Sequence, residues 1–298
     1  MPSLKEIKER IASVGNTLKI TSAMKMVAAA KLRKAQKALG NLGPYQACLS
    51  RILSTAATGA SAEGGPLNGN LLAALSAPRS EVRSVALVCF ASNQSLCGAF
   101  NTNVVKLATK VVEEYRLAGV EVSVFPVGRK MADAMRRLGF TSGDDYSSLS
   151  ARPSYEGAAA LGRILTEGYI SGRFDRIELV YNHLHSTASQ PSVRETYLPL
   201  DASAGFSAHD GSDFEPDVII EPDRDSLIAE LLPKVLDLKV YTTLLDASAA
   251  EHAARTVAMQ MATDNAEELL QALKLEYNKS RQQKITAEIL DLVGGAMQ

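Results

Sequence analysis

The residues of this 298-residue chain that could do chemistry are few and do not form a catalytic set. Cys97 and Gly98 follow an apolar run, where a cysteine could act as a nucleophile between a strand and a helix. His183 and His185 could serve as its base, but a cysteine packed beneath the start of a helix is far commoner. These histidines also lack a third nearby metal ligand. We therefore expect no catalytic residue, no metal and no cofactor.

Phosphate-binding and hydrolase motifs are also missing from the sequence. The segment 128–130 (Gly-Arg-Lys) lacks the earlier glycine and the following hydroxyl of a phosphate loop. No GxGxxG, HExxH or GxSxG occurs. The cysteines Cys48, Cys89 and Cys97 form no CxxC pair, so we expect neither a disulfide nor a zinc site. This pattern favours interaction over catalysis, and an α/β enzyme with a ligand pocket is the alternative.

Two long helices and a small domain must position whatever surface does the work. From residue 3 to about 58, apolar residues recur at alternating steps of three and four, which is typical of a helix paired with another helix. These seam positions are Leu4, Ile7, Ile11, Val14, Leu18, Thr21, Lys25, Ala28, Leu32, Ala35, Leu39 and Leu42. Ser3 and Glu6 match a capping box at the helix start. We expect Gly43-Pro44 to bend or break this helix.

A second helix is predicted from about residue 226 to 293. It has a seven-residue step at Leu238, Leu245, Met259, Ala266 and Leu273, with His252 in the same register. We expect Pro233 to kink it early and Gly294-Gly295 to end it. At about 1.5 Å per residue these helices would be about 80 and 100 Å long, so they must pair with each other or with partner chains.

Between these helices the sequence alternates strands and helices. The predicted strands are 82–90, 120–127, 176–182 and 194–198, and the predicted helices are 101–117, 129–138 and 155–170. This spacing indicates a Rossmann-like, mostly parallel sheet with helices on both faces. The fold class is therefore α/β, with two long terminal helices. We expect terminal helices at 1–58 and 222–298, linkers at 59–81 and 201–221, and an α/β domain at 82–200.

Charge is unevenly distributed along the chain. The net charge is −1, yet the first 39 residues hold nine Lys and Arg against two Glu. Such a basic helix suits an acidic protein surface, a nucleic acid or a membrane surface, and an ordinary solvated face is an equal alternative. The sequence contains no run of 18 apolar residues and no apolar leader. We expect a cytoplasmic chain.

The ends of the chain resemble one protein family. The segments 11–31, 258–266, 277–282 and 285–289, with the ending 293–296, closely resemble the gamma subunits of rotary ATP synthases. The resemblance runs in matching order over essentially the whole chain. It implies that the two terminal helices form a long antiparallel coiled coil. It also implies a non-catalytic rotor that couples ion flow to ATP synthesis or hydrolysis. The implied partners are the alpha and beta subunits, the epsilon subunit and the membrane ring of c subunits, with no nucleic acid and no transmembrane segment.

The resemblance also implies roles for individual residues. Positions matching the family's contacts with the catalytic ring are Met24, Lys25, Arg255, Gln282, Thr286 and Glu288. Glu221 and Ile220 match the region that meets the c ring, on the cytoplasmic face of a bacterial membrane. Periodicity alone favours solvated helix residues for the ring contacts, and a helix-start acid is the alternative for Glu221.

The match has one departure. The family commonly shows Asp-Arg-Gly-Leu-Cys-Gly after the first strand, whereas residues 93–98 here are Asn-Gln-Ser-Leu-Cys-Gly. A charge pair carried by that acid and arginine is therefore not expected. The cysteine-containing insertion of photosynthetic relatives is absent too, which argues against thiol control.

Overall fold

The computed structural model describes residues 3–62, 71–79, 81–140, 145–200, 220–221 and 223–296. It divides into two compact units, which are described separately. Unit 1 is Met1–Ala30 with Arg255–Gln298, and unit 2 is Lys31–Ala254. The two longest helices, α1 (Leu4–Ala62) and α8 (Arg224–Ala296), each contribute residues to both units.

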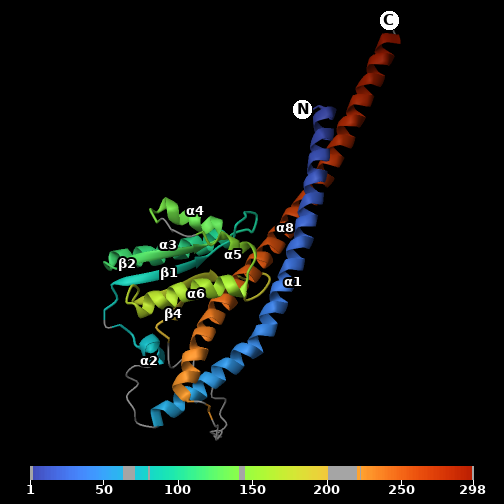
Figure 1. Ribbon diagram of the computed structural model, residues 1–298. Helices are drawn as coiled ribbons and strands as arrows, with labels where there is room; N and C mark the ends of the chain where they lie inside the picture. Colours follow the sequence, from blue (N-terminus) through green and yellow to red (C-terminus); the bar gives the residue numbers. More distant parts are fainter. Residues whose placement is uncertain are drawn as a thin grey trace. The chain divides into compact units, whose positions relative to one another are not determined.

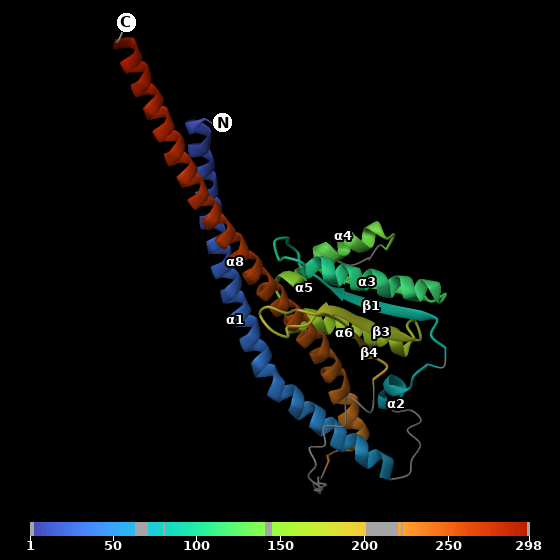
Figure 2. The ribbon, with the colours of Figure 1, turned by 180° about the vertical axis from the view of Figure 1, so that it is seen from behind.

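Unit 1 is an antiparallel helix pair. Thr263 donates a hydrogen bond to Thr21 across the pair (3.0 Å), and Lys25 donates to Gln260 (2.8 Å), so numbers rise along one helix as they fall along the other. Figures 1 and 2 show the two segments, dark blue and red, side by side. Ile7 and Ala28 are 1% and 2% exposed, and the other predicted seam positions are buried or half-buried. The predicted coiled-coil pairing is confirmed.

The starts of both long helices follow their local sequence. At α1, the Ser3 amide donates to Glu6 (2.8 Å) and the Glu6 amide donates to Ser3 Oγ (3.3 Å), which is the predicted capping box. At α8, Asp223 accepts from the amide (2.8 Å) and the hydroxyl (2.7 Å) of Ser226.

Of the three predicted interruptions, the bend near Pro44 is seen, the kink at Pro233 stays a prediction, and the end of α8 at Gly294-Gly295 is wrong. Pro44 lies inside α1 and Pro233 inside α8. α1 curves in its lighter blue part but continues to Ala62, beyond the predicted end near residue 58 (Figure 1). Each proline removes one backbone hydrogen bond, which side-chain packing on both sides can offset. α8 likewise runs through the glycine pair at 294–295, because glycine costs a helix only about 1 kcal/mol.

Unit 2 is built around a four-stranded sheet. The strands are β1 (Ser84–Phe90), β2 (Glu121–Val127), β3 (Arg176–Asn182) and β4 (Ser192–Leu198), in the order β2-β1-β3-β4. The first three pair in parallel and β4 is antiparallel to β3, so the predicted mostly parallel sheet is confirmed. Central β1 is buried on both faces, which explains its uninterrupted apolar sequence.

Helices cover both faces of the sheet, as predicted. α3 (Phe100–Leu117) and α4 (Arg129–Arg137) cover one face, where Val85, Leu87 and Cys89 meet their apolar side chains. α6 (Tyr155–Ile170) and the unit 2 part of α8 cover the other face, over Ala86, Val88 and Phe90. Figure 2 shows α3 and α6 on opposite sides of the strands.

Two short helices were not predicted. α2 (Leu71–Ser76) lies inside the predicted linker 59–81, and α5 (Ser147–Ala151) precedes α6. Both are too short to show a helical period. Leu72, Leu75 and Leu149 are nevertheless buried in the core beneath α6 and α8. The predicted linker 201–221 falls almost wholly outside the described residues.

The alanine-rich part of α8 brings it close to α1 within unit 2. Leu32 and Ala35 of α1 pack against Ala249 and Ala253 of α8, which are both fully buried. Small side chains at this contact let the two backbones approach closely.

Candidate partner-contact surfaces

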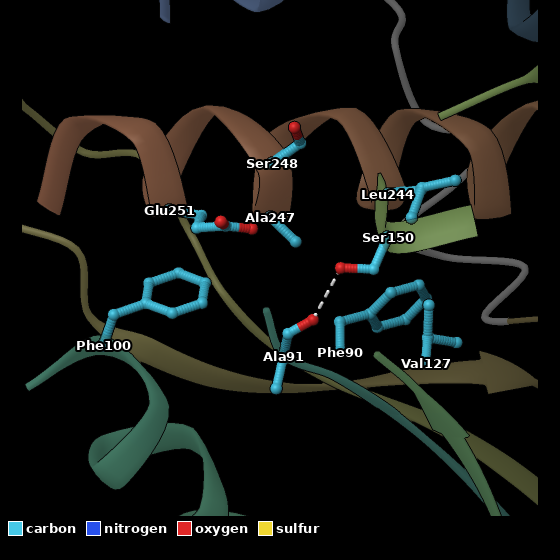
Figure 3. A pocket seen from close by; sticks show the side chains of 9 residues that line it. All are labelled: Phe90, Ala91, Phe100, Val127, Ser150, Leu244, Ala247, Ser248 and Glu251. Atoms are coloured by element: carbon cyan, nitrogen blue, oxygen red, sulfur yellow. Dashed lines mark hydrogen bonds between the residues drawn. The ribbon is translucent and has the colours of Figure 1, made fainter. Parts of the chain in front are cut away.

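A small cavity lies within the described part of unit 2. Its volume is about 10 Å³, and Figure 3 shows its lining. The lining residues are Phe90, Ala91, Phe100, Val127, Ser150, Leu244, Ala247, Ser248 and Glu251. This volume suits about one water molecule, whereas pockets for small-molecule ligands are about 300–1,000 Å³. The cavity therefore gives no support to the enzyme alternative.

The segments that follow β1 and β2 are joined to the neighbouring helices by hydrogen bonds. Asn93 accepts a hydrogen bond from the Arg129 amide at the start of α4 (2.8 Å) and donates to the Ser147 carbonyl of α5 (2.7 Å). Ser150 of α5 donates to the Ala91 carbonyl (2.9 Å). Asn93 thus joins two helices, and an aspartate there could not donate to Ser147.

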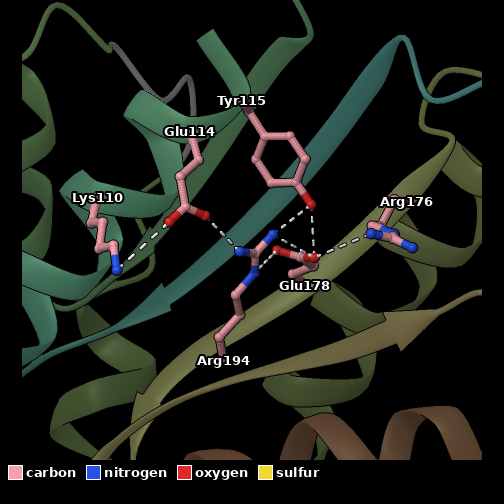
Figure 4. A network of polar contacts seen from close by, with 6 residues as sticks. All are labelled: Lys110, Glu114, Tyr115, Arg176, Glu178 and Arg194. Atoms are coloured by element: carbon pink, nitrogen blue, oxygen red, sulfur yellow. Dashed lines mark hydrogen bonds and ion pairs between the residues drawn. The ribbon is translucent and has the colours of Figure 1, made fainter. Parts of the chain in front are cut away.

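A polar network links α3, β3 and β4 in unit 2 (Figure 4). Buried Glu178 accepts hydrogen bonds from Tyr115 (2.7 Å) and from Nε of Arg194 (2.7 Å). Arg194 also binds Glu114 (2.9 Å), which lies 3.9 Å from Lys110. Burial and the bond to Glu178 raise the pKa of Tyr115. Burial opposes the charge of Arg194, but Glu178 and Tyr115 together outweigh it and raise the pKa of Arg194. Each charge faces an opposite charge or a donor, so the network fits a structural role.

The candidate nucleophile and metal ligands have structural partners. Cys97 is 1% exposed and packs against Phe100 at the start of α3, as predicted. His183 pairs with Asp246 of α8 (Nδ1 to Oδ2, 2.6 Å). Within the described ranges, no group of three or more His, Cys, Asp or Glu side chains could hold a metal ion. Cys89 is fully buried, and burial raises the pKa of its thiol.

The residues matched to ring contacts differ in their exposure. Met24 and Lys25 are half-buried in unit 1, where the Lys25 ammonium already binds Gln260. Arg255 is buried, at 7% exposure, which is not what a ring-facing side chain requires. Of this set, Lys25 and Arg255 are therefore the least available to a partner.

The remaining ring positions lie on an open stretch of α8. Gln282, Thr286 and Glu288 are all exposed, and Thr286 donates to the Gln282 carbonyl within the helix (2.9 Å). Glu288 lies 3.9 Å from Lys284 one turn away. These three side chains make local contacts only among the described residues and can face a partner.

The two positions matched to the c ring lie just before α8. Glu221 is exposed, and Ile220 is partly buried against the core of unit 2. Ile220 and Glu221 adjoin in the sequence, and of the two only Glu221 is exposed.

Sequence periodicity missed an exposed apolar surface on unit 1. Its members lie outside the helix seam and are between 48% and 74% exposed. They are Ile20, Met26 and Val27 on α1, and Met261, Leu269, Leu275, Ile285, Ile289, Leu290, Leu292 and Val293 on α8. We call this set the rod surface. Apolar residues that fall outside a three-four seam were the signal that could have revealed it.

Basic side chains accompany this surface along α1. All of the Lys and Arg in the first 39 residues are exposed except Lys25, which is half-buried. Within the parts of the chain described here, no helix combines the length and apolarity needed to cross a membrane.

Comparisons with known proteins cover the whole chain. A family model described as ATP synthase matches residues 3–297. The chain is 50% identical over 298 residues to the ATP synthase gamma chain of Phocaeicola vulgatus, covering 100% of both. It is 48% identical over 307 residues to the ATP synthase gamma chain of Bacteroides thetaiotaomicron, again covering 100% of both.

Solved structures show the same fold. The rotor of the mitochondrial ATP synthase of Euglena gracilis is similar with a TM-score of 0.59 at 21% identity, covering 95% of this chain and 98% of that one. The central stalk and c ring of the Tetrahymena thermophila mitochondrial enzyme gives a TM-score of 0.55 at 22% identity, covering 82% and 99%.

Proposed function

Because the chain belongs to the ATP synthase gamma chain family, we propose that it is the central-stalk rotor of an ATP synthase. In this role it carries no catalytic residue. It couples ion flow through the membrane c ring to conformational cycling of three catalytic beta subunits, for ATP synthesis or hydrolysis.

The observation that carries this proposal is the rod surface of unit 1. Its eleven apolar side chains are each at least 48% exposed outside the helix seam, and so many exposed apolar groups on one helix pair favour a partner that covers them. A sleeve of alpha and beta subunits would cover it. Met24, Gln282, Thr286 and Glu288 would contact that sleeve, with Lys25 and Arg255 contributing after rearrangement.

The proposed coupling mechanism depends on the asymmetry of the helix pair within the ring. A single helix pair inside a ring of three like subunits cannot contact all three in the same way. Each catalytic subunit is then held in a different conformation, and rotation exchanges those conformations. Coupling requires contact free energies that differ between the states. The basic face of α1 would meet acidic surfaces, which favours orientation and rate of association more than affinity.

The remaining assignments follow from the same proposal. The terminal helices 1–58 and 222–298 would form the shaft, and 82–200 the foot, joined by 59–81 and 201–221. Glu221 and Ile220 would contact the c ring, and the foot would bind the epsilon subunit. The complex would sit peripherally on the cytoplasmic face of a bacterial inner membrane.

Native purification of the tagged chain tests this proposal. We expect it to co-elute with a hexamer that hydrolyses ATP, and we expect Met26→Ser with Val27→Ser to weaken that association. Leu117→Ser is the matched control, because Leu117 is a 91% exposed apolar residue on α3. A free monomer, or a chain bound to nucleic acid with a steep salt dependence, would contradict the proposal.

A further inference from the structure

The hairpin formed by β3 and β4 grips α8 through polar contacts that the function above does not account for. Lys239 of α8 donates to Glu195 of β4 (2.6 Å), and Tyr181 of β3 donates to the same carboxylate (3.1 Å). Seven residues along α8, Asp246 pairs with His183 (2.6 Å) and accepts from the Leu184 amide (3.0 Å). We call these contacts, all within unit 2, the hairpin seam.

The spacing of Lys239 and Asp246 along α8 lets the hairpin seam resist movement of this helix. Seven residues make almost two helical turns, so both side chains leave α8 in nearly the same direction about 10 Å apart along its axis. One anchor would let the helix pivot about that point. Two anchors at different heights resist both rotation of the helix and tilting.

The apolar packing around α8 resists rotation of this helix less effectively than the polar contacts of the hairpin seam do. Between α8 and the sheet lie mainly aliphatic side chains, such as Leu232, Leu236 and Val240. Apolar contact is non-directional and tolerates small sliding movements. Hydrogen bonds and ion pairs weaken when their geometry changes, so they set the angle of α8 against the sheet.

The hairpin is itself braced. The His183 amide donates to the Pro191 carbonyl (2.9 Å), and the backbones of Ser186 and Ser189 bond to each other. Leu184 packs against the apolar contact between α1 and α8 and against the start of α3. A load applied at Asp246 therefore passes into the sheet rather than into a loose loop.

We propose that the hairpin seam is a torsional lock, with Lys239 and Asp246 as positioning residues that hold α8 at a fixed angle to the α/β sheet during rotation. The inference rests on the proposed rotor function. The lock makes the connection between the α/β domain and α8 stiffer.

Hydrogen exchange on the isolated full-length chain tests the seam itself. We expect Asp246→Ala with Lys239→Ala to speed exchange of the Leu184 amide by about fivefold, because that amide loses its acceptor. Asp246→Asn retains an acceptor for the same amide and should have a smaller effect. Glu230→Gln is the matched control, since it removes the negative charge of the Lys234–Glu230 pair (2.7 Å), which lies wholly on α8. Unchanged Leu184 exchange in the double variant would overturn the seam.

Single-molecule rotation of the complete catalytic head tests whether the hairpin seam holds the angle of α8 under load. A probe is attached at Leu117→Cys on α3, with the exposed Cys48 replaced by serine. We expect the double alanine variant to broaden the angular distribution at each pause, whereas Lys239→Arg alone, which keeps a cation opposite Glu195, and Glu230→Gln should leave it unchanged. Faster exchange with an unaltered angular distribution would reduce the seam to a structural contact and overturn the lock. Failure of the unmodified chain to rotate would instead reject the rotor function, whatever the exchange result.

Discussion

Glu178 illustrates how a single side chain constrains the α/β domain. It is 2% exposed on β3, and two of its donors come from other elements, Tyr115 on α3 and Arg194 on β4. A buried carboxylate is costly unless it is paired and hydrogen-bonded. The network therefore specifies how α3 and the edge strand sit on the sheet.

We expect Arg194→Met to lower the free energy of unfolding by about 1–3 kcal/mol, because buried Glu178 then loses its nearer cation (2.7 Å) and keeps only Arg176 at 3.9 Å. Chemical denaturation measures the change. Arg136→Met is the control, since it breaks an exposed pair with Asp133 (3.2 Å) and should cost under about 1 kcal/mol. Equal losses in the two variants would show that Glu178 is not held as the structure indicates.

Asp237 gives a pH-dependent prediction. It is 7% exposed on α8, and burial raises the pKa of its carboxyl above the ordinary 3.8, opposed in part by Arg163. The folded chain therefore binds this proton more tightly than the unfolded chain. This contribution to stability is full below pH 3.8 and is lost as the pH rises through the raised pKa.

Replacing Asp237 with Asn should remove this dependence. We expect Asp237→Asn to raise the melting temperature at pH 7, and the gain over the unmodified chain to shrink as the pH falls toward 3.8. Melting curves at several pH values measure it. A gain that grows on acidification would mean that the carboxylate is stabilised in the folded state.

At the scale of elements, the helix pair of unit 1 has a register that can be tested. Thr21 and Thr263 are both buried and in direct contact. We expect Thr21→Cys with Thr263→Cys to form a disulfide on mild oxidation, seen as a mobility shift on non-reducing gels. Ile20→Cys with Thr263→Cys is the control, since Ile20 is 60% exposed and lies off the seam. A cross-link in the control alone would place the seam one residue away.

Most elements could be predicted from the sequence because their signals are local. The capping box at Ser3, the seven-residue repeat and the apolar strand at 84–90 each depend on neighbouring residues. What the sequence could not supply was tertiary. Packing carries α1 through Pro44, and the core recruits the short helix α2, whose six residues show no period.

The candidate contacts were harder to predict for the same reason. A seam position and a partner-facing position look alike when only spacing is considered. Arg255 is buried and Lys25 is bound to Gln260, whereas exposed Ile20 and Met26 were not selected. Separating the two classes requires knowing which face of each helix its own chain covers.

At the scale of the whole molecule, the C-terminal end of α8 is a segment that matters little for folding and that we expect to matter for assembly. Residues 281–290 are all exposed, so this chain makes little use of them for its own stability. Ile285, Ile289 and Leu290 are exposed apolar residues, which the proposed sleeve of alpha and beta subunits would bury. The chain thus keeps a segment whose value lies in assembly.

We expect a chain ending at Lys284 to unfold at the same temperature as the full-length chain, because the residues it lacks contribute little burial. In the assembled enzyme it should generate less torque, because the lost apolar contacts no longer hold the shaft in its sleeve. Calorimetry on the isolated chain and single-molecule rotation of the head measure the two effects. Leu273→Ala is the matched control: Leu273 is 7% exposed in the seam, so its truncation should destabilise unit 1 by about 2–5 kcal/mol. If the α/β domain of the shortened chain failed to fold, the prediction would be wrong. The folding of that domain would then depend on residues of α8 that the full-length chain leaves exposed.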